Sequence, residues 1–117
     1  MVKYFSLLRK KPNWTEAEFR YHWKHVHGPL LTKLPGLVKY VQYHVRSQVS
    51  PDVEQVDEPI QGIAEMWFES EAALKQAMSS PDGQRVAKDA AELLGKSNHF
   101  DHLLKIEETL EFLSPKA

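Results

Sequence analysis

The chain has 117 residues, 42 % of them hydrophobic, and a net charge of −1 from 15 basic and 16 acidic side chains. This size predicts one globular domain over residues 1–117, and the near-neutral charge argues against nucleic acid as a partner. The absence of cysteine excludes disulfides and a thiolate nucleophile. Neither a signal peptide nor an apolar run of membrane-spanning length is visible. We therefore expect a cytoplasmic protein that does not contact a membrane.

The first predicted element is a strand over Val2 to Lys10, in which apolar side chains point to both faces. A strand of this kind is typical of the interior of a sheet. Thr15 and Glu18 then show the spacing of a capping box, and Trp14 is placed to pack against Phe19. The first helix is therefore predicted to begin at Thr15.

The back half of this helix combines an apolar stripe with histidines. At about 100° per residue, one stripe contains Phe19, Trp23, Val26 and Leu30. His22 and His27 fall on its two borders, and Pro29 predicts a kink or restart immediately after His27. A histidine on such a border is a candidate for acid–base chemistry. The alternative is that these histidines are solvated residues near a helix C-terminus.

A second strand is predicted from Leu37 to Val49. Its two faces carry Val38, Tyr40, Gln42 and His44 on one side and Leu37, Lys39, Val41, Tyr43 and Val45 on the other. Tyr40, Gln42 and His44 can each donate or accept a hydrogen bond, as the lining of a polar cavity must. The alternative is that this face is the solvent side of an antiparallel strand.

The second half of the chain predicts a strand, a helix interrupted once, and a last strand. A polar connector over 50–59 is interpreted as either a mobile lid or a subunit arm. A strand over Ile60 to Glu69 has two faces, with Ile63, Glu65 and Trp67 on one and Ala64, Met66 and Phe68 on the other. Helical spacing begins at Ser70, restarts at Ser80 and ends at Gly95, and an alternating strand follows over Leu103 to Leu113.

The order β-α-β-β-α-β predicts an α+β, ferredoxin-like fold, a four-stranded antiparallel sheet with helices on one face. The other face carries either Trp67 or the pair Met66 and Phe68, and it needs a second cover. A second copy of the chain can supply that cover through a symmetric contact. We therefore expect a homodimer with sheet packed against sheet.

Two blocks of the sequence resemble a known family. The run Trp23 to Leu30, which contains His-Gly-Pro-Leu, and the run Leu34 to His44, which begins Leu-Pro-Gly-Leu, are similar to the EthD family of dimeric α/β-barrel proteins. They also resemble the methylmuconolactone methylisomerases of the same superfamily. The resemblance implies a cavity between sheet and helices and cofactor-free proton transfer. The family's helix histidine falls on His27 and the isomerase's cavity tyrosine on Tyr40, whereas its cavity cysteine falls on Met66, which has no thiol.

The resulting hypothesis is a cofactor-free lyase or isomerase that acts on a small, mostly apolar cyclic substrate. A neutral imidazole, with a pKa of about 6.5, can move a proton next to a carbonyl, and a phenol or amide can hydrogen-bond the enolate oxygen. In this hypothesis His27 is the general acid or base, and Tyr40 and His44 orient or polarise the substrate. The expected substrate-binding residues are Gln42, Trp23, Met66 and Phe68.

Three alternatives remain open at this stage. A metal could use His22 and His25, which share a helix face, but His25 and His27 diverge by about 200° and cannot chelate together on a regular helix. A haem could use a helix histidine, although no second haem signature is present. The chain could also be a non-catalytic binding or stress-linked dimer whose cavity only holds a small ligand. The histidines of the segment 99–102 are interpreted as structural, in a loop that enters the last strand; the alternative is that this segment approaches the mouth of the cavity.

Overall fold

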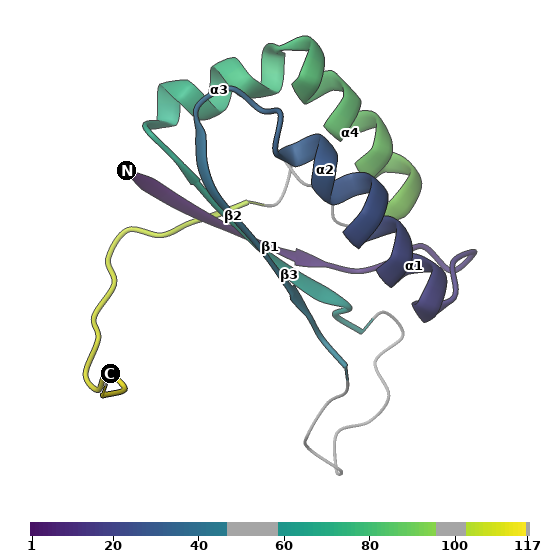
Figure 1. The fold of residues 1–117 in the computed structure, drawn as a ribbon, viewed down its shortest axis with the longest axis horizontal. Helices are drawn as coiled ribbons and strands as arrows, with labels where there is room; N and C mark the ends of the chain where they lie inside the picture. The colour runs from purple at the N-terminus through teal and green to yellow at the C-terminus, as the bar shows by residue number, and fades with distance from the viewer. Residues whose placement is uncertain (47–58, 96–102, 117) are drawn as a thin grey trace.

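The computed structural model describes residues 1–46, 59–95 and 103–116, and Figure 1 shows all of its helices on one side of a single sheet. The strands are β1 Val2–Leu8, β2 Leu37–His44, β3 Gly62–Phe68 and β4 Leu104–Lys105; the helices are α1 Glu16–His22, the π-helical η1 Trp23–His27, α2 Gly28–Leu31, α3 Glu71–Ser79 and α4 Pro81–Leu93. The sheet is antiparallel, in the order β2-β3-β1-β4. This is the α+β, ferredoxin-like arrangement that the sequence predicts.

The core lies between the sheet and the helices. On the two middle strands, the side chains that point toward the helices are Tyr4, Ser6, Leu8, Ala64, Met66 and Phe68, and all are buried. The register pairs Met66 with Tyr4 on one side and with Tyr40 on the other. The structure thus decides which face of β3 is covered: Met66 and Phe68 are core residues, and Trp67 lies on the outer face.

The predicted start of α1 is confirmed. The hydroxyl of Thr15 accepts from the backbone N–H of Glu18 at 3.1 Å, and the N–H of Thr15 donates to the Glu18 carboxylate at 2.9 Å. Trp14 packs on the core cluster that contains Phe19. The capping box therefore fixes where the helix begins, and the contact of Trp14 fixes the direction from which the chain enters it.

The change predicted at Pro29 takes the form of a π turn. The N–H of Gly28 donates to the carbonyl of Trp23, five residues earlier, and α2 continues directly from this wider turn. Pro29 has no N–H to give to the carbonyl of His25, so one α-helical bond is lost here in any case. The helix therefore changes its winding without breaking.

The π turn corrects the predicted buried stripe. The residues of this helix that are 0 % exposed are Phe19, Trp23, His27 and Leu31, each four positions after the last. A regular α-helix drifts by about 40° over four residues, and the extra residue in the π turn removes much of that drift. His27 therefore lies inside the buried stripe, whereas Val26, which was expected there, is 42 % exposed.

A β-bulge corrects the predicted faces of β2. The register with β3 shifts between Leu37 and Lys39. Leu37 consequently packs against the same core cluster as Tyr40, while Val38 is 43 % exposed. The strict alternation that placed Val38 beside Tyr40 fails because a bulge adds one residue to one strand. The strand also ends at His44, earlier than predicted.

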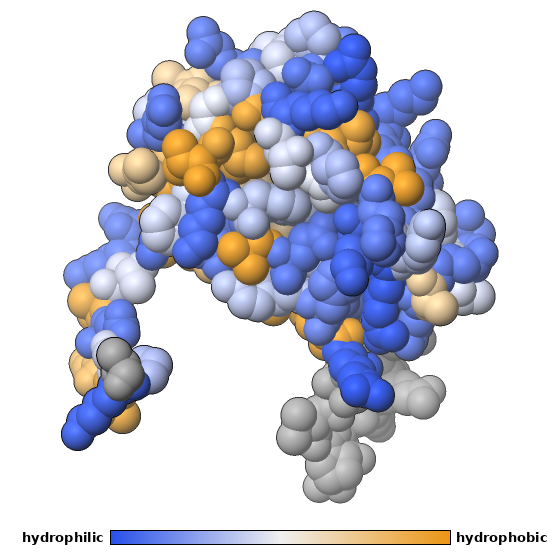
Figure 2. Space-filling view, in the orientation of Figure 1, coloured by the Kyte–Doolittle hydropathy of each residue, from blue (hydrophilic) through white to orange (hydrophobic). Residues whose placement is uncertain are grey.

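The last strand is much shorter than predicted. Only Leu104–Lys105 is a strand, although Ile106 still donates a backbone hydrogen bond to Lys3. The segment beyond leaves the body of the molecule, and Figure 2 shows hydrophobic residues along it; Leu110, Phe112 and Leu113 are 65 %, 88 % and 92 % exposed. Alternation alone does not hold an edge strand when nothing covers its apolar side.

The remaining predicted elements follow the sequence closely. Ser80 ends α3 and caps α4, where its hydroxyl accepts from the N–H of Gly83 at 3.1 Å.

In the connector 50–59 every position except Pro59 lies outside the described residues, as does the segment 99–102. No helix in the described ranges is long and apolar enough to cross a membrane.

We expect Gly62→Ala to destabilise the fold by about 1–3 kcal/mol, the usual cost of overpacking a core. A Cβ at Gly62 would lie 2.4 Å from the Trp23 ring, which fills the space between η1 and β3. Urea unfolding measures the loss. The same change made together with Trp23→Phe should cost less, because the shorter ring leaves room for the methyl group; an equal cost in both backgrounds would contradict this explanation.

Candidate functional site

One carboxylate bridges two histidines between the first helical segment and α4. Asp89 Oδ2 lies 2.7 Å from Nδ1 of His27, and Asp89 Oδ1 lies 2.8 Å from Nε2 of His22. His27 is wholly buried, and the side chains of Asp89 and His22 are 13 % and 19 % exposed. A base that acts on a substrate held by Tyr40 and His44 is expected to face β2, but this hydrogen bond of His27 goes to α4.

The hydrogen bonds of this cluster set its charges. Burial raises the pKa of the Asp89 carboxyl, but the hydrogen bonds and charges of His27 and His22 outweigh burial and hold that pKa below its ordinary value. Asp89 is thus ionised at neutral pH and accepts hydrogen bonds only. The Nδ1 of His27 must therefore carry a hydrogen, and in the neutral ring Nε2 carries the basic lone pair.

Asp89 is the residue of this site that the sequence prediction missed. It follows Val86 by three positions and precedes Leu93 by four, so it occupies the apolar face of α4. An acidic residue at such a position needs a hydrogen-bond partner inside the protein. That conflict was the available signal, and the two histidines resolve it.

A second group of hydrogen bonds joins β2 to the helix. The amide nitrogen of Gln42 donates to the Trp23 carbonyl and to the Tyr40 hydroxyl, both at 2.8 Å, and its oxygen lies 2.9 Å from Nε2 of His44. Gly28 allows this approach, because a Cβ there would lie 2.9 Å from the Gln42 amide nitrogen. The predicted face with Tyr40, Gln42 and His44 therefore points toward the helices.

Tyr40 is a hydrogen-bonding group and not a base. Burial raises the pKa of its phenol to about 12, although the hydrogen bond from Gln42 acts in the opposite direction. The phenol is therefore neutral at physiological pH. A neutral phenol can donate a hydrogen bond to a developing oxyanion.

The predicted substrate-binding residues lie on both sides of this network. Gln42 belongs to it, and Trp23 is buried between the two groups, where its carbonyl meets Gln42 and its ring lies 4.5 Å from the His44 ring. Met66 and Phe68 are fully buried in the cluster that Tyr40 packs against. The π turn Trp23–His27 therefore carries both His27 and the Trp23 carbonyl that Gln42 binds.

The predicted metal alternative has no built site in the part of the chain that the structure describes, where no group of three or more possible ligands could hold a metal ion. His22 binds Asp89, whereas His25 is exposed and its ring lies 4.6 Å from that of Tyr21. The two histidines that share a predicted helix face therefore have different partners.

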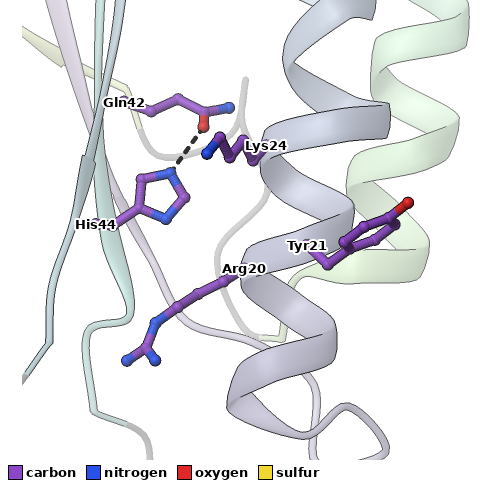
Figure 3. Close-up of a pocket in the computed structure, with 5 residues that line it drawn as sticks. All are labelled: Arg20, Tyr21, Lys24, Gln42 and His44. Carbon is purple, nitrogen blue, oxygen red and sulfur yellow. Dashed lines mark hydrogen bonds between the residues drawn. The ribbon is translucent and has the colours of Figure 1, made fainter.

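An open pocket adjoins the hydrogen-bonded side chains of Tyr40, Gln42 and His44. It has a volume of about 530 Å³ and lies between α1, η1 and β2, with a lining of Arg20, Tyr21, Lys24, Gln42 and His44 (Figure 3). Gln42 takes part in both the pocket wall and the hydrogen bond to Tyr40. The open pocket and the hydrogen bonds around Tyr40 therefore meet at Gln42.

Comparison with solved structures places this architecture among known proteins. An ethyl tert-butyl ether D (EthD) family protein from Bacillus halodurans is 28 % identical, with a TM-score of 0.70 over 93 % of this chain and 100 % of that chain. A DABB family protein with a ferredoxin-like fold from Mesorhizobium loti is 18 % identical, with a TM-score of 0.57 over 94 % of this chain and 97 % of that chain.

One further neighbour has a stated activity. SnoaB, a cofactor-independent oxygenase from Streptomyces nogalater, is 16 % identical, with a TM-score of 0.56 over 93 % of this chain and 95 % of that chain; this likeness shows the fold alone. No curated protein matches the chain significantly. The model of the EthD domain matches residues 11–97, which is most of the sequence, and the chain belongs to the EthD family.

Proposed function

We propose that this chain is a lyase or isomerase that moves a proton on a small cyclic substrate without a cofactor. The observation that supports this most directly is the 2.7 Å contact between Nδ1 of the buried His27 and Asp89. A carboxylate in this position holds the imidazole in one tautomer and stabilises the imidazolium that forms when the ring takes a proton. His27 therefore has the setting of a general base.

In the proposed reaction, Nε2 of His27 removes a proton from a carbon next to a carbonyl group. The electron pair of the broken C–H bond moves into the carbonyl, which becomes an enolate, and the Tyr40 phenol donates a hydrogen bond to the enolate oxygen. The imidazolium then returns the proton, either to another carbon or to a leaving group. The proton and electron balance closes without a metal or a redox cofactor.

A second candidate function is non-catalytic binding of a small ligand. The complete burial of His27 favours it, since a buried histidine tied to a carboxylate can serve only to hold two helices together. In that case the inner network of Tyr40 and Gln42 would shape a binding site and no bond would change.

Exchange with heavy water distinguishes the two functions. The protein, treated with a chelator, is incubated in D₂O with a panel of ring ketones, lactones and ring acids, and deuterium incorporation is followed by NMR. The proposed enzyme should exchange the acidic C–H of at least one ring class faster than buffer does, whereas a binder should not. Exchange that disappears with the chelator would contradict the cofactor-free mechanism.

Tyr40→Phe should reduce this exchange by about tenfold or less, because it removes one hydrogen bond to the oxyanion and leaves the proton carrier in place. The effect should appear in kcat, since the bond strengthens only as the enolate forms. A loss as large as that of His27 variants would instead make the phenol part of the proton transfer itself.

We further propose that two copies of the chain pack sheet against sheet. The outer face of the sheet has three cross-strand rows, and two of them contain apolar side chains: Phe5, Glu65 and Val41 in one row, and Leu7, Ile63 and Tyr43 in the other. The third row is Lys3, Trp67 and Lys39, with the lysine nitrogens 4.6 and 4.5 Å from the Trp67 ring. Glu65 on this face already accepts hydrogen bonds from Tyr43 and Trp67.

Light scattering at micromolar concentration should therefore report about twice the chain mass. Ile63→Glu should give the monomer, since it places a charge at the centre of the row of Leu7, Ile63 and Tyr43. Val26→Glu makes the same chemical change on the exposed helix side and should leave the mass doubled. A wild-type monomer, or equal behaviour of the two variants, would contradict this interface.

A further inference from the structure

The open pocket between α1 and β2 carries two positive charges and no acidic side chain among the described residues that line it. Arg20 and Lys24 lie four residues apart, extend from the helix toward the strand, and face Gln42 and His44 (Figure 3). The ring of Tyr21 points away from the strand. At about 530 Å³ the pocket is in the size range of small-molecule sites.

The positive charges of this pocket are only weakly compensated by the protein. Arg20 lies 3.6 Å from the exposed carboxylate of Glu16 and donates to the Val45 carbonyl at 3.4 Å. The ammonium group of Lys24 has no hydrogen bond or ion pair with any described residue. An anion that enters the pocket therefore meets cations that are not committed to strong partners elsewhere.

The wall opposite Arg20 and Lys24 consists of the neutral side chains of Gln42 and His44. Partial burial, followed by the positive charges of Lys24 and Arg20, lowers the pKa of the His44 ring. His44 is thus neutral at physiological pH, and its Nε2 is engaged with the Gln42 oxygen at 2.9 Å. The net charge of the described lining is therefore positive. The two cations, and not the Gln42 amide, supply the donors for an anion, because that amide already donates both of its hydrogens.

We propose that this pocket binds the carboxylate of a small cyclic acid. The planar fork of Arg20 and the ammonium of Lys24 suit carboxylate oxygens, and the helix spacing presents both cations to one group. Gln42 then places the ring of that acid beside the hydrogen bond to Tyr40. The inference rests on the proposed function only in calling this acid the substrate, which makes the substrate an anionic ring.

Calorimetric titration at low ionic strength tests the site without turnover, with benzoate as the probe and benzamide as its neutral match. Benzoate should bind saturably and more tightly than benzamide, and added salt should weaken it. Lys24→Gln and Arg20→Gln should each weaken binding by about five- to tenfold. Lys33→Gln and Arg85→Gln, which remove exposed charges outside the pocket, should leave it unchanged.

Three results would overturn the inference: no saturable benzoate binding, benzamide binding as tightly as benzoate, or pocket variants that behave like the controls. Inorganic phosphate provides a further arm, because binding as tight as that of benzoate would make this a general anion site and not a carboxylate site. Carboxylate binding that survives alongside a complete absence of deuterium exchange would disprove the proposed catalysis and leave this inference standing.

Discussion

His27→Asn should lower turnover by about 10²–10⁴, the usual contribution of a general acid–base group, while the fold survives. Asparagine is the informative replacement because its amide nitrogen can donate to Asp89 much as Nδ1 of His27 does at 2.7 Å. It has no basic nitrogen, so it removes the proton carrier and keeps the hydrogen bond. Deuterium exchange into a responsive ring substrate measures the loss, and thermal unfolding checks the fold.

His27→Ala is a less informative variant, because it changes stability as well as chemistry. A histidine on a helix border could be replaced with little effect on the melting point, but this ring is wholly buried and bound to a carboxylate. Its removal leaves Asp89 with one histidine fewer, which costs about 1–3 kcal/mol. A loss of activity in the alanine variant would therefore mix chemistry with stability.

The matched control is His22→Gln. The amide nitrogen of glutamine can take the place of Nε2, the atom by which His22 reaches Asp89 at 2.8 Å. His22 is partly exposed and is the other histidine on the same carboxylate, so the variant should keep most of the activity. Loss of activity in His22→Gln with full activity in His27→Asn would show that the helix acts through its other edge.

The sequence predicts the fold well because its local signals agree with one another. The capping box at Thr15, the double role of Ser80 and the alternation of Ala64, Met66 and Phe68 each specify an element from neighbouring residues alone, and the structure contains all of them. The predicted last strand does not form at its full length because none of the residues that the structure describes covers its apolar side chains. Local pattern therefore predicts an element only where packing supports it.

The site is harder to predict because it depends on deviations from regular geometry. The π turn at Trp23–His27 moves His27 from the border of the stripe into it, and the bulge in β2 moves Val38 away from Tyr40. Each deviation changes the direction in which a side chain points. Helical and strand periods assume regular winding, so they place the right residues in the right elements and misplace what those residues face.

Asp89→Asn should destabilise the protein at neutral pH by about 1–3 kcal/mol, because the amide cannot accept from both histidines as the carboxylate does. The native carboxyl has a lowered pKa, so it contributes stability that is present above its unfolded pKa of about 3.9 and is lost as the pH falls through the native value. The difference between wild type and variant should therefore shrink under acid conditions. Asp82→Asn, which removes a more exposed carboxylate on the same helix, should cost less than about 1 kcal/mol.

Asp89→Asn should also lower turnover by about 10²–10⁴. An asparagine amide that donates to Nδ1 of His27 forces the hydrogen of the neutral ring onto Nε2, which removes the basic lone pair from the nitrogen assigned to proton transfer. The loss should appear in kcat and remain at temperatures where the variant is fully folded. Full activity in folded Asp89→Asn would mean that the carboxylate only joins α4 to the first helix, and His27 would lose its assignment as the base.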